Sequence, residues 1–157
     1  TKRHCLLKDR LIEWDGKVAR MEIAFDTTES EIEKQQLKFT LEAEKTITEC
    51  IGILYRENGV STAIIEVLRK LGNFLSAERT YIIYIKDELR YNDYEWCAEN
   101  IISQKNTLQG IPLAMIDRWI PYFKNDKCVI IENLEEIKEI SLEEYEILDS
   151  QSITSLV

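Results

Sequence analysis

The alternation of apolar and polar residues near the start of the chain predicts a β-hairpin. In "IEWDGKVARMEIAFD", residues 12–26, two strand-like runs flank Asp15-Gly16, a dipeptide that tolerates the positive φ angles of a type I′ turn. We therefore expect Arg10 to Trp14 to pair with Lys17 to Phe25. A lone hairpin is barely stable in water, so the pattern raises the question of which sheet this hairpin belongs to.

A long stretch of good helix formers follows the hairpin. Asp26, Thr27 or Thr28 can cap a helix, and Asn58-Gly59 supplies a stop, which predicts a helix from about Ser30 to Glu57. Such a helix would extend about 42 Å, a length typical of a connector between domains or of a paired coil. Four apolar residues in its second half fall on one helix face at i, i+3, i+4, i+7 spacing, namely Ile47, Cys50, Ile51 and Leu54.

The next segment changes its period twice. Ser61 is a plausible cap for a second helix, whose apolar face comprises Ile64, Val67, Leu68, Leu71 and Leu75. The β-branched and aromatic run from Thr80 to Ile85 is typical of a strand buried on both faces. From Tyr91 to Cys97, large aromatic residues alternate with acidic ones, the pattern of a strand with one solvated face.

The last third of the chain predicts helix, strand, helix and strand. Pro112 suits the first turn of a helix that Pro121 ends or kinks. The run "KCVIIEN", residues 127–133, is typical of a compact strand. Ser141 and Glu144 form a capping box before a short helix, and "SITSLV" at residues 152–157 again has a strand-like pattern.

Composition limits the classes of function. A chain of 157 residues has room for one domain, or one domain and a fragment of another. With 45% hydrophobic and 31% charged residues and no long apolar run, it reads as a soluble cytoplasmic protein without a membrane partner. The net charge of −9 repels phosphate backbones, so we expect no nucleic-acid partner.

Candidate catalytic and metal-binding residues are sparse. The glycines form no phosphate-binding loop, and the four cysteines and the single His4 form no metal-ligand cluster or nucleophile–base pair. We therefore expect no enzyme activity, metal or cofactor, and we interpret the cysteines as buried free thiols. The acidic residues Glu132, Glu135, Glu136 and Glu139 are interpreted as a solvated surface.

Aromatic residues supply the candidate binding site. Five of them come from elements that we expect to pack on the same sheet: Tyr81, Tyr94, Trp96, Trp119 and Phe123. Aromatic rings with few polar groups can line a small-molecule pocket, and they can equally fill a core. Both interpretations stay open at this point.

The order of these elements resembles a known family of sensor domains. Together with "LGNFLSAERTYIIYI", "YEWCAENI", "IPLAMIDRWIPYFKNDKCVIIENLEEIKE" and "YEILDSQSITSLV", it is similar to the N-terminal part of a GAF domain, of the kind that precedes GGDEF domains in bacterial signalling proteins. Likewise "WDGKVARMEIAFDTTE" resembles the last hairpin of a PAS domain, whose final Asp-x-Thr element is matched here by Asp26 and Thr28. The orphan hairpin would then belong to a PAS sheet.

The resemblance implies a domain organisation and a fold. Residues 1–28 would be the end of a PAS-like domain, residues 29–58 a signalling connector helix, and residues 59–157 a GAF-like domain truncated at its C-terminus. The fold class is α/β (α+β), with a GAF-like antiparallel sheet flanked by helices.

The resemblance also implies a role. The chain contains no GGDEF motif, so any diguanylate cyclase activity of a parent protein would reside elsewhere. The signatures of cyclic-nucleotide-binding and bilin-binding GAF domains are missing as well. We expect a non-catalytic sensory module that forms a homodimer through the connector helix and binds a small ligand. The alternative is a purely structural dimerisation and relay domain without a ligand.

Overall fold

A computed structural model of the chain describes residues 3–57 and 59–157. Residues 1, 2 and 58 lie outside the described residues. The first two belong to the expected PAS-like segment, and Asn58 belongs to the expected connector and to the predicted helix stop. The chain divides into two compact units, Thr1–Gly52 and Ile53–Val157, and each is considered by itself. No helix among the described residues is both long and apolar enough to span a bilayer.

The first unit begins with the predicted β-hairpin. Strand β1 (Cys5–Trp14) pairs antiparallel with β2 (Lys17–Asp26) along its whole length. The φ angles of Asp15 and Gly16 are 55° and 73°, which are the positive values that a type I′ turn requires at both central positions. The hairpin prediction is therefore confirmed, and the paired strands are longer than the apolar pattern alone indicated.

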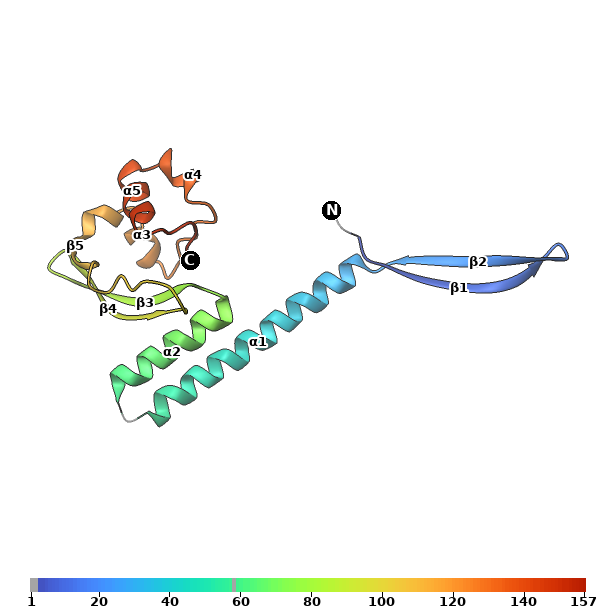
Figure 1. The fold of residues 1–157 in the computed structure, drawn as a ribbon, viewed down its shortest axis with the longest axis horizontal. Coiled ribbons are helices and arrows are strands. Elements are labelled where there is room, and N and C mark those ends of the chain that lie inside the picture. The colour runs from blue at the N-terminus through green and yellow to red at the C-terminus, as the bar shows by residue number, and fades with distance from the viewer. Residues whose placement is uncertain (1–2, 58) are drawn as a thin grey trace. The chain divides into compact units, whose positions relative to one another are not determined.

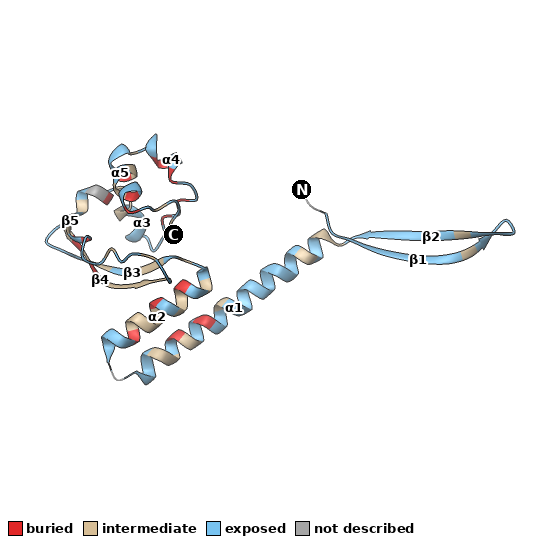
Figure 2. Ribbon diagram, in the orientation of Figure 1, coloured by how far each residue is buried: buried red, intermediate tan, exposed pale blue. Residues whose placement is uncertain are grey.

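The hairpin is mostly exposed on both faces (Figure 2). Successive side chains of a strand point to opposite faces, and the register gathers most of the large apolar residues on one of them: Leu6, Ile12, Trp14, Met21, Ile23 and Phe25. The indole of Trp14 is 69% exposed. Nothing in this unit covers that apolar face among the described residues.

A long helix follows directly. Helix α1 (Thr28–Arg56) matches the expected helix from Ser30 to Glu57 within two residues at each end. Its first turn is fixed because the backbone N–H of Thr28 donates to Oδ1 of Asp26 at 3.0 Å. The apolar side chains in its first half are exposed, with Leu37 at 61% and Leu41 at 56%.

The second unit places helix α2 (Val60–Leu75) against a sheet. Our prediction that Ser61 caps this helix is wrong, because the N-cap is Gly59, without a side-chain capping bond. The hydroxyl of Ser61 lies 3.2 Å from the hydroxyl of Tyr94 instead. Ser61 therefore ties the helix to the sheet rather than starting it.

The sheet has three antiparallel strands in the order β3-β4-β5. They are β3 (Arg79–Lys86), β4 (Leu89–Cys97) and β5 (Gln109–Pro112). Helix α2 covers one face, where Thr80 Oγ1 donates to the carbonyl of Leu68 at 2.8 Å. The short helices of residues 113–157 lie on the other side of the sheet (Figure 1), so this unit has a helix, a sheet and a second helical layer.

The expectation that residues 80–85 are buried on both faces is wrong. β3 is an edge strand, and among the described residues its only neighbour is β4. The residues of β3 are of intermediate burial or exposed, and the exposed large hydrophobic ones range from 37% at Tyr81 to 50% at Ile85. β-branched and aromatic residues favour any pleated strand, so this composition could not distinguish an edge strand from a central one.

The segment that follows also departs from the expected helix. Pro112 ends strand β5, which the apolar pattern did not reveal, and Gly110 in this strand has a φ of 67°. A 3₁₀ turn (Leu113–Ile116) comes next, followed by α3 (Ile120–Phe123). Pro121 lies in the first turn of α3 and so begins this helix rather than ending one.

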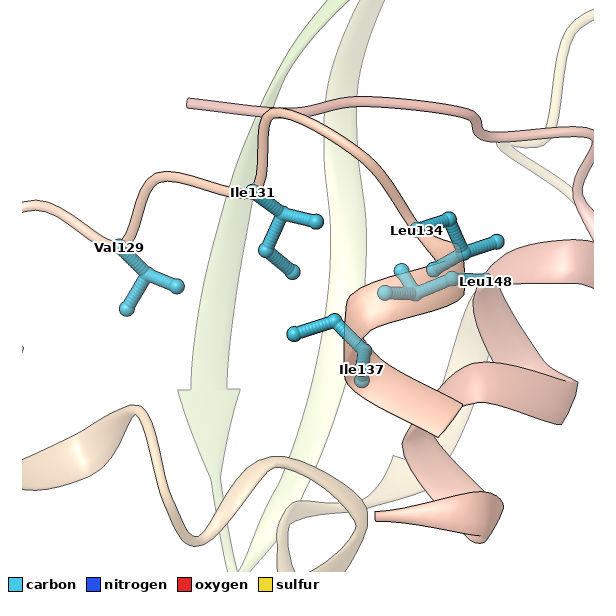
Figure 3. Close-up of a cluster of buried hydrophobic side chains, with 5 residues drawn as sticks. All are labelled: Val129, Ile131, Leu134, Ile137 and Leu148. Atoms are coloured by element: carbon cyan, nitrogen blue, oxygen red, sulfur yellow. The ribbon is translucent and has the colours of Figure 1, made fainter. Parts of the chain in front are cut away.

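The C-terminal segment contains little regular strand. The predicted strands at residues 127–133 and 152–157 are reduced to a single bridge between Ile131 and Leu156, because neither run has a neighbouring strand with which to continue the ladder. Helix α4 (Glu135–Lys138) is one turn long. The buried apolar cluster of this region comprises Val129, Ile131, Leu134, Ile137 and Leu148 (Figure 3).

The capping-box prediction is confirmed. The Oγ atom of Ser141 accepts a hydrogen bond from the backbone N–H of Glu144 at the start of α5 (Leu142–Ser150). Glu132, Glu135, Glu136 and Glu139 are exposed, as expected. The interpretation of all cysteines as buried is wrong, since Cys5 and Cys128 are exposed and only Cys50 is buried; Cys5 lies on the exposed hairpin.

Candidate functional site: a sheet face with buried, unpaired polar groups

The candidate site lies on β4, on the sheet face opposite α2. Arg90 pairs across the ladder with Ile85, and Asn92 pairs with Ile83. These β3 residues alternate with Thr80 and Ile82, which lie on the α2 side, so Arg90 and Asn92 point to the other face. Arg90 is 6% exposed and Asn92 is 1% exposed.

These two side chains contain polar atoms that are buried without a partner. Within the described residues, nothing forms a hydrogen bond with Nε or Nη2 of Arg90, or with Nδ2 or Oδ1 of Asn92. Buried polar groups in native proteins are nearly always hydrogen-bonded. Leaving one unpaired costs about 1–3 kcal/mol, and more if it is charged. Two adjacent exceptions on one face therefore require an explanation.

The backbone holds both side chains in place. The N–H of Asn92 donates to the carbonyl of Leu108 at 2.9 Å, and its own carbonyl accepts from Nε2 of Gln109 at 2.8 Å. Arg90 is paired with strands on both sides. These pairings fix the face of the sheet to which both side chains point.

Two irregularities of the sheet flank the site. The β3–β4 register shifts so that Asp93 is the extra residue, and the β4–β5 register shifts at Gly110. Such bulges bend a strand and redirect its side chains, and they are frequent beside functional sites. Here the bulge at Asp93 brings Arg90 and Asn92 to the face opposite Tyr94 and Trp96.

Tyr81 lies on the same face as Arg90. Partial burial raises the pKa of the Tyr81 phenol above its usual value, while the nearby charges of Arg79 and Arg90 act in the opposite direction and Glu95 adds to the rise. Burial lowers the pKa of the Arg90 guanidinium. These couplings indicate that the groups share one electrostatic environment.

Glu95, the carboxylate that acts on Tyr81, is already engaged in hydrogen bonds. Glu95 accepts hydrogen bonds from the backbone N–H of Gln104 at 3.0 Å and of Lys105 at 2.8 Å, and a further one from the hydroxyl of Ser103. Arg79 donates from Nη2 to the carbonyl of Gln151 at 2.7 Å. Arg90 is thus left without an acidic partner among the described residues.

A second buried charge in the same unit is fully paired. Glu144 is 3% exposed, and Arg118 donates to it from Nε at 3.0 Å and from Nη2 at 2.7 Å. The indole Nε1 of Trp119 also donates to Glu144, at 2.8 Å. This network satisfies a buried charge within the fold, so the unpaired state of Arg90 is not a general property of the unit.

The structure does not bring the five predicted aromatic residues together. Tyr81 lies on the Arg90 face, whereas Tyr94 and Trp96 pack on the α2 face. Trp119 and Phe123 form an edge-to-face pair with ring centroids 6.3 Å apart, and Trp119 packs against the buried apolar cluster. Of the five, only Tyr81 lies beside the unpaired groups.

No protein-family model matches this chain, and no curated protein matches it either. Within the described residues, no three His, Cys, Asp or Glu side chains are grouped so that they could hold a metal ion. The function is therefore argued from the Arg90 face itself.

Proposed function

We propose that this chain is a non-catalytic regulatory module that binds a small molecule on the Arg90 face of its sheet. The observation that carries the proposal is the pair of buried side chains, Arg90 and Asn92, whose polar atoms lack partners in the described part of the chain. A bound molecule that formed hydrogen bonds with those atoms would remove the free-energy cost of leaving them buried and unpaired.

The architecture supports a sensory role of the GAF type. The second unit has an antiparallel sheet with a helix on one face and short helices and loops on the other. This arrangement is compatible with the resemblance of residues 59–157 to a GAF domain. In this proposal the ligand binds between the sheet and residues 113–157. Its occupancy is then relayed to an output domain outside this chain.

A homodimer through α1 is part of the proposal. Leu37 and Leu41 lie four residues apart on one helix face and are 61% and 56% exposed. A partner helix from a second copy would cover them. The mass measured by light scattering should be that of a dimer for the wild type and of a monomer for the Leu37→Glu, Leu41→Glu double variant; a monomeric wild type would refute this part.

Ligand binding is tested with a panel of charged and neutral metabolites. The denaturation temperature of the wild type should rise with at least one compound, because a ligand that binds only the native state stabilises that state. Asn92→Leu should remove the shift, and Asn106→Leu, a substitution at an exposed loop position, should retain it. If no compound shifts the wild type, the alternative of a relay domain without a ligand is favoured.

A further inference from the structure

Arg90 and Asn92 together specify the chemistry of the molecule they would hold. We infer that the Arg90 face binds a small monocarboxylate with a hydroxyl or amino group close to the carboxylate. This inference rests on the proposed function and names the ligand class for the same face.

The unpaired atoms of Arg90 match a carboxylate. Nε and Nη2 are neighbouring donors of one planar fork, and they can bond the two oxygens of a carboxylate side by side. The chain itself contains such a pair, since Arg118 uses the same two nitrogens to hold Glu144. At Arg90 the two donors are present and the carboxylate is missing from the described residues.

The charge balance favours a single negative charge. Glu95 is held by the loop at residues 103–105, and Arg79 donates to a backbone carbonyl. Arg90 can therefore neutralise one negative charge in a buried position. A phosphate dianion would bring a second, unpaired charge out of water, which is strongly unfavourable.

Asn92 indicates the second group of the ligand. Both Nδ2 and Oδ1 are unpaired, so the Asn92 amide can donate one hydrogen bond and accept another. A hydroxyl or an amino group of the ligand can form hydrogen bonds of both kinds with it. Residues two apart on a strand are separated by roughly 6.5 Å, which a ligand of a few heavy atoms can bridge. Ile83, across the ladder from Asn92, offers an apolar surface to the remainder of a small ligand.

The test uses three probes of similar size or charge. They are 2-hydroxy-3-methylbutanoate, its uncharged primary amide, and inorganic phosphate. We expect the hydroxy acid to bind the wild type in calorimetry and to raise its denaturation temperature. The amide should bind about tenfold to a hundredfold more weakly, because a charge-assisted bidentate bond is lost. Phosphate should bind more weakly than the acid.

Variants assign the binding of the hydroxy acid to Arg90. Arg90→Met should abolish binding of the hydroxy acid and Arg90→Lys should weaken it, because lysine cannot supply the fork. Arg69→Met is the matched control, since Arg69 lies on α2 and pairs with Glu66 at the surface; it should bind as the wild type does. The Nε–H resonance of Arg90 in the wild type should also shift when the acid binds, and this measurement does not depend on how a variant folds.

Several results would overturn the inference. Equal affinity for the acid in the wild type and Arg90→Met, tighter binding of phosphate than of the acid, or no response of the Arg90 resonance would each refute it. If no acid binds but a neutral compound does, and that binding is lost in Asn92→Leu, the carboxylate inference fails while the proposed function stands. If no compound of any charge binds, both fail.

Discussion

Replacing Gly72 by alanine should destabilise the second unit, against the usual effect of this substitution. Gly72 lies inside α2, where alanine is ordinarily more favourable than glycine by about 1 kcal/mol. A Cβ atom at this position would lie 2.5 Å from Cε3 and 3.2 Å from Cη2 of Trp96. The indole ring would have to move, since carbon atoms pack at about 3.5–4.0 Å.

The two effects can be weighed. Overpacking a well-filled site costs about 1–3 kcal/mol, and more where backbone has to shift. Because the Cβ atom would lie only 2.5 Å from a ring carbon, the cost lies in the upper part of this range, about 2–3 kcal/mol, and subtracting about 1 kcal/mol of helix propensity leaves a net loss of about 1–2 kcal/mol. For a unit of this size, such a loss lowers the denaturation temperature by about 5–10 °C. Thermal denaturation followed by circular dichroism measures the shift.

A second background isolates the clash. In Trp96→Leu the ring is gone, so adding Gly72→Ala should no longer destabilise and should raise stability by up to about 1 kcal/mol through helix propensity. The sign of the alanine effect should thus depend on residue 96. A denaturation temperature of Gly72→Ala at or above that of the wild type, or the same effect in both backgrounds, would refute the reasoning.

Three further substitutions or modifications give separate tests. Glu144→Gln should lower the free energy of unfolding in urea by about 2–3 kcal/mol, because it removes a buried charge from Arg118; an unchanged midpoint would contradict this. Arg90→Met should raise the denaturation temperature of the ligand-free protein, because it removes an unpaired buried charge, and a decrease would count against the burial argument. Burial raises the pKa of Cys97, with a smaller contribution from an acidic neighbour. Iodoacetamide should therefore label Cys97 more slowly than the exposed Cys128. The rate of Cys97 labelling should keep increasing at alkaline pH. Equal labelling rates of the two cysteines by mass spectrometry would contradict this prediction.

Local signals in the sequence predicted the elements whose geometry is set by neighbouring residues. Asp15-Gly16 fixes the hairpin because both residues tolerate a positive φ, and the two-residue turn then determines the register. Ser141 begins α5 because its side chain bonds the backbone three residues later. In both cases the relevant contacts lie within a few residues.

The candidate site depends on a feature without such a signal. An uninterrupted alternation along β4 would place Arg90 and Asn92 on the same face as Tyr94 and Trp96. The extra residue Asp93 reverses this, and no glycine or proline marks the bulge. The aromatic pattern therefore drew attention to the α2 face, while the unpaired groups lie on the other one.

Residues 127–133 failed as a strand for a related reason. An apolar β-branched run favours a strand only if a neighbour completes its ladder, and here Ile131 finds only Leu156. Which segment pairs with which is decided by tertiary packing. A single sequence does not contain that information in local form.

The layer over the Arg90 face differs from the sheet in how firmly it is held. β3, β4 and β5 are joined by antiparallel ladders with one register shift each. In the described part of the chain, the segment after them is hydrogen-bonded to β3 through Arg79 and Gln151 and to the β3–β4 turn through Leu113 and Glu88, and the isolated bridge at Ile131 closes it on itself. Proteins open locally where a segment has few hydrogen bonds and few buried contacts to the rest of the fold. If the Arg90 face binds a ligand as proposed, transient detachment of the covering segment, with the sheet intact, would set how quickly that ligand enters or leaves.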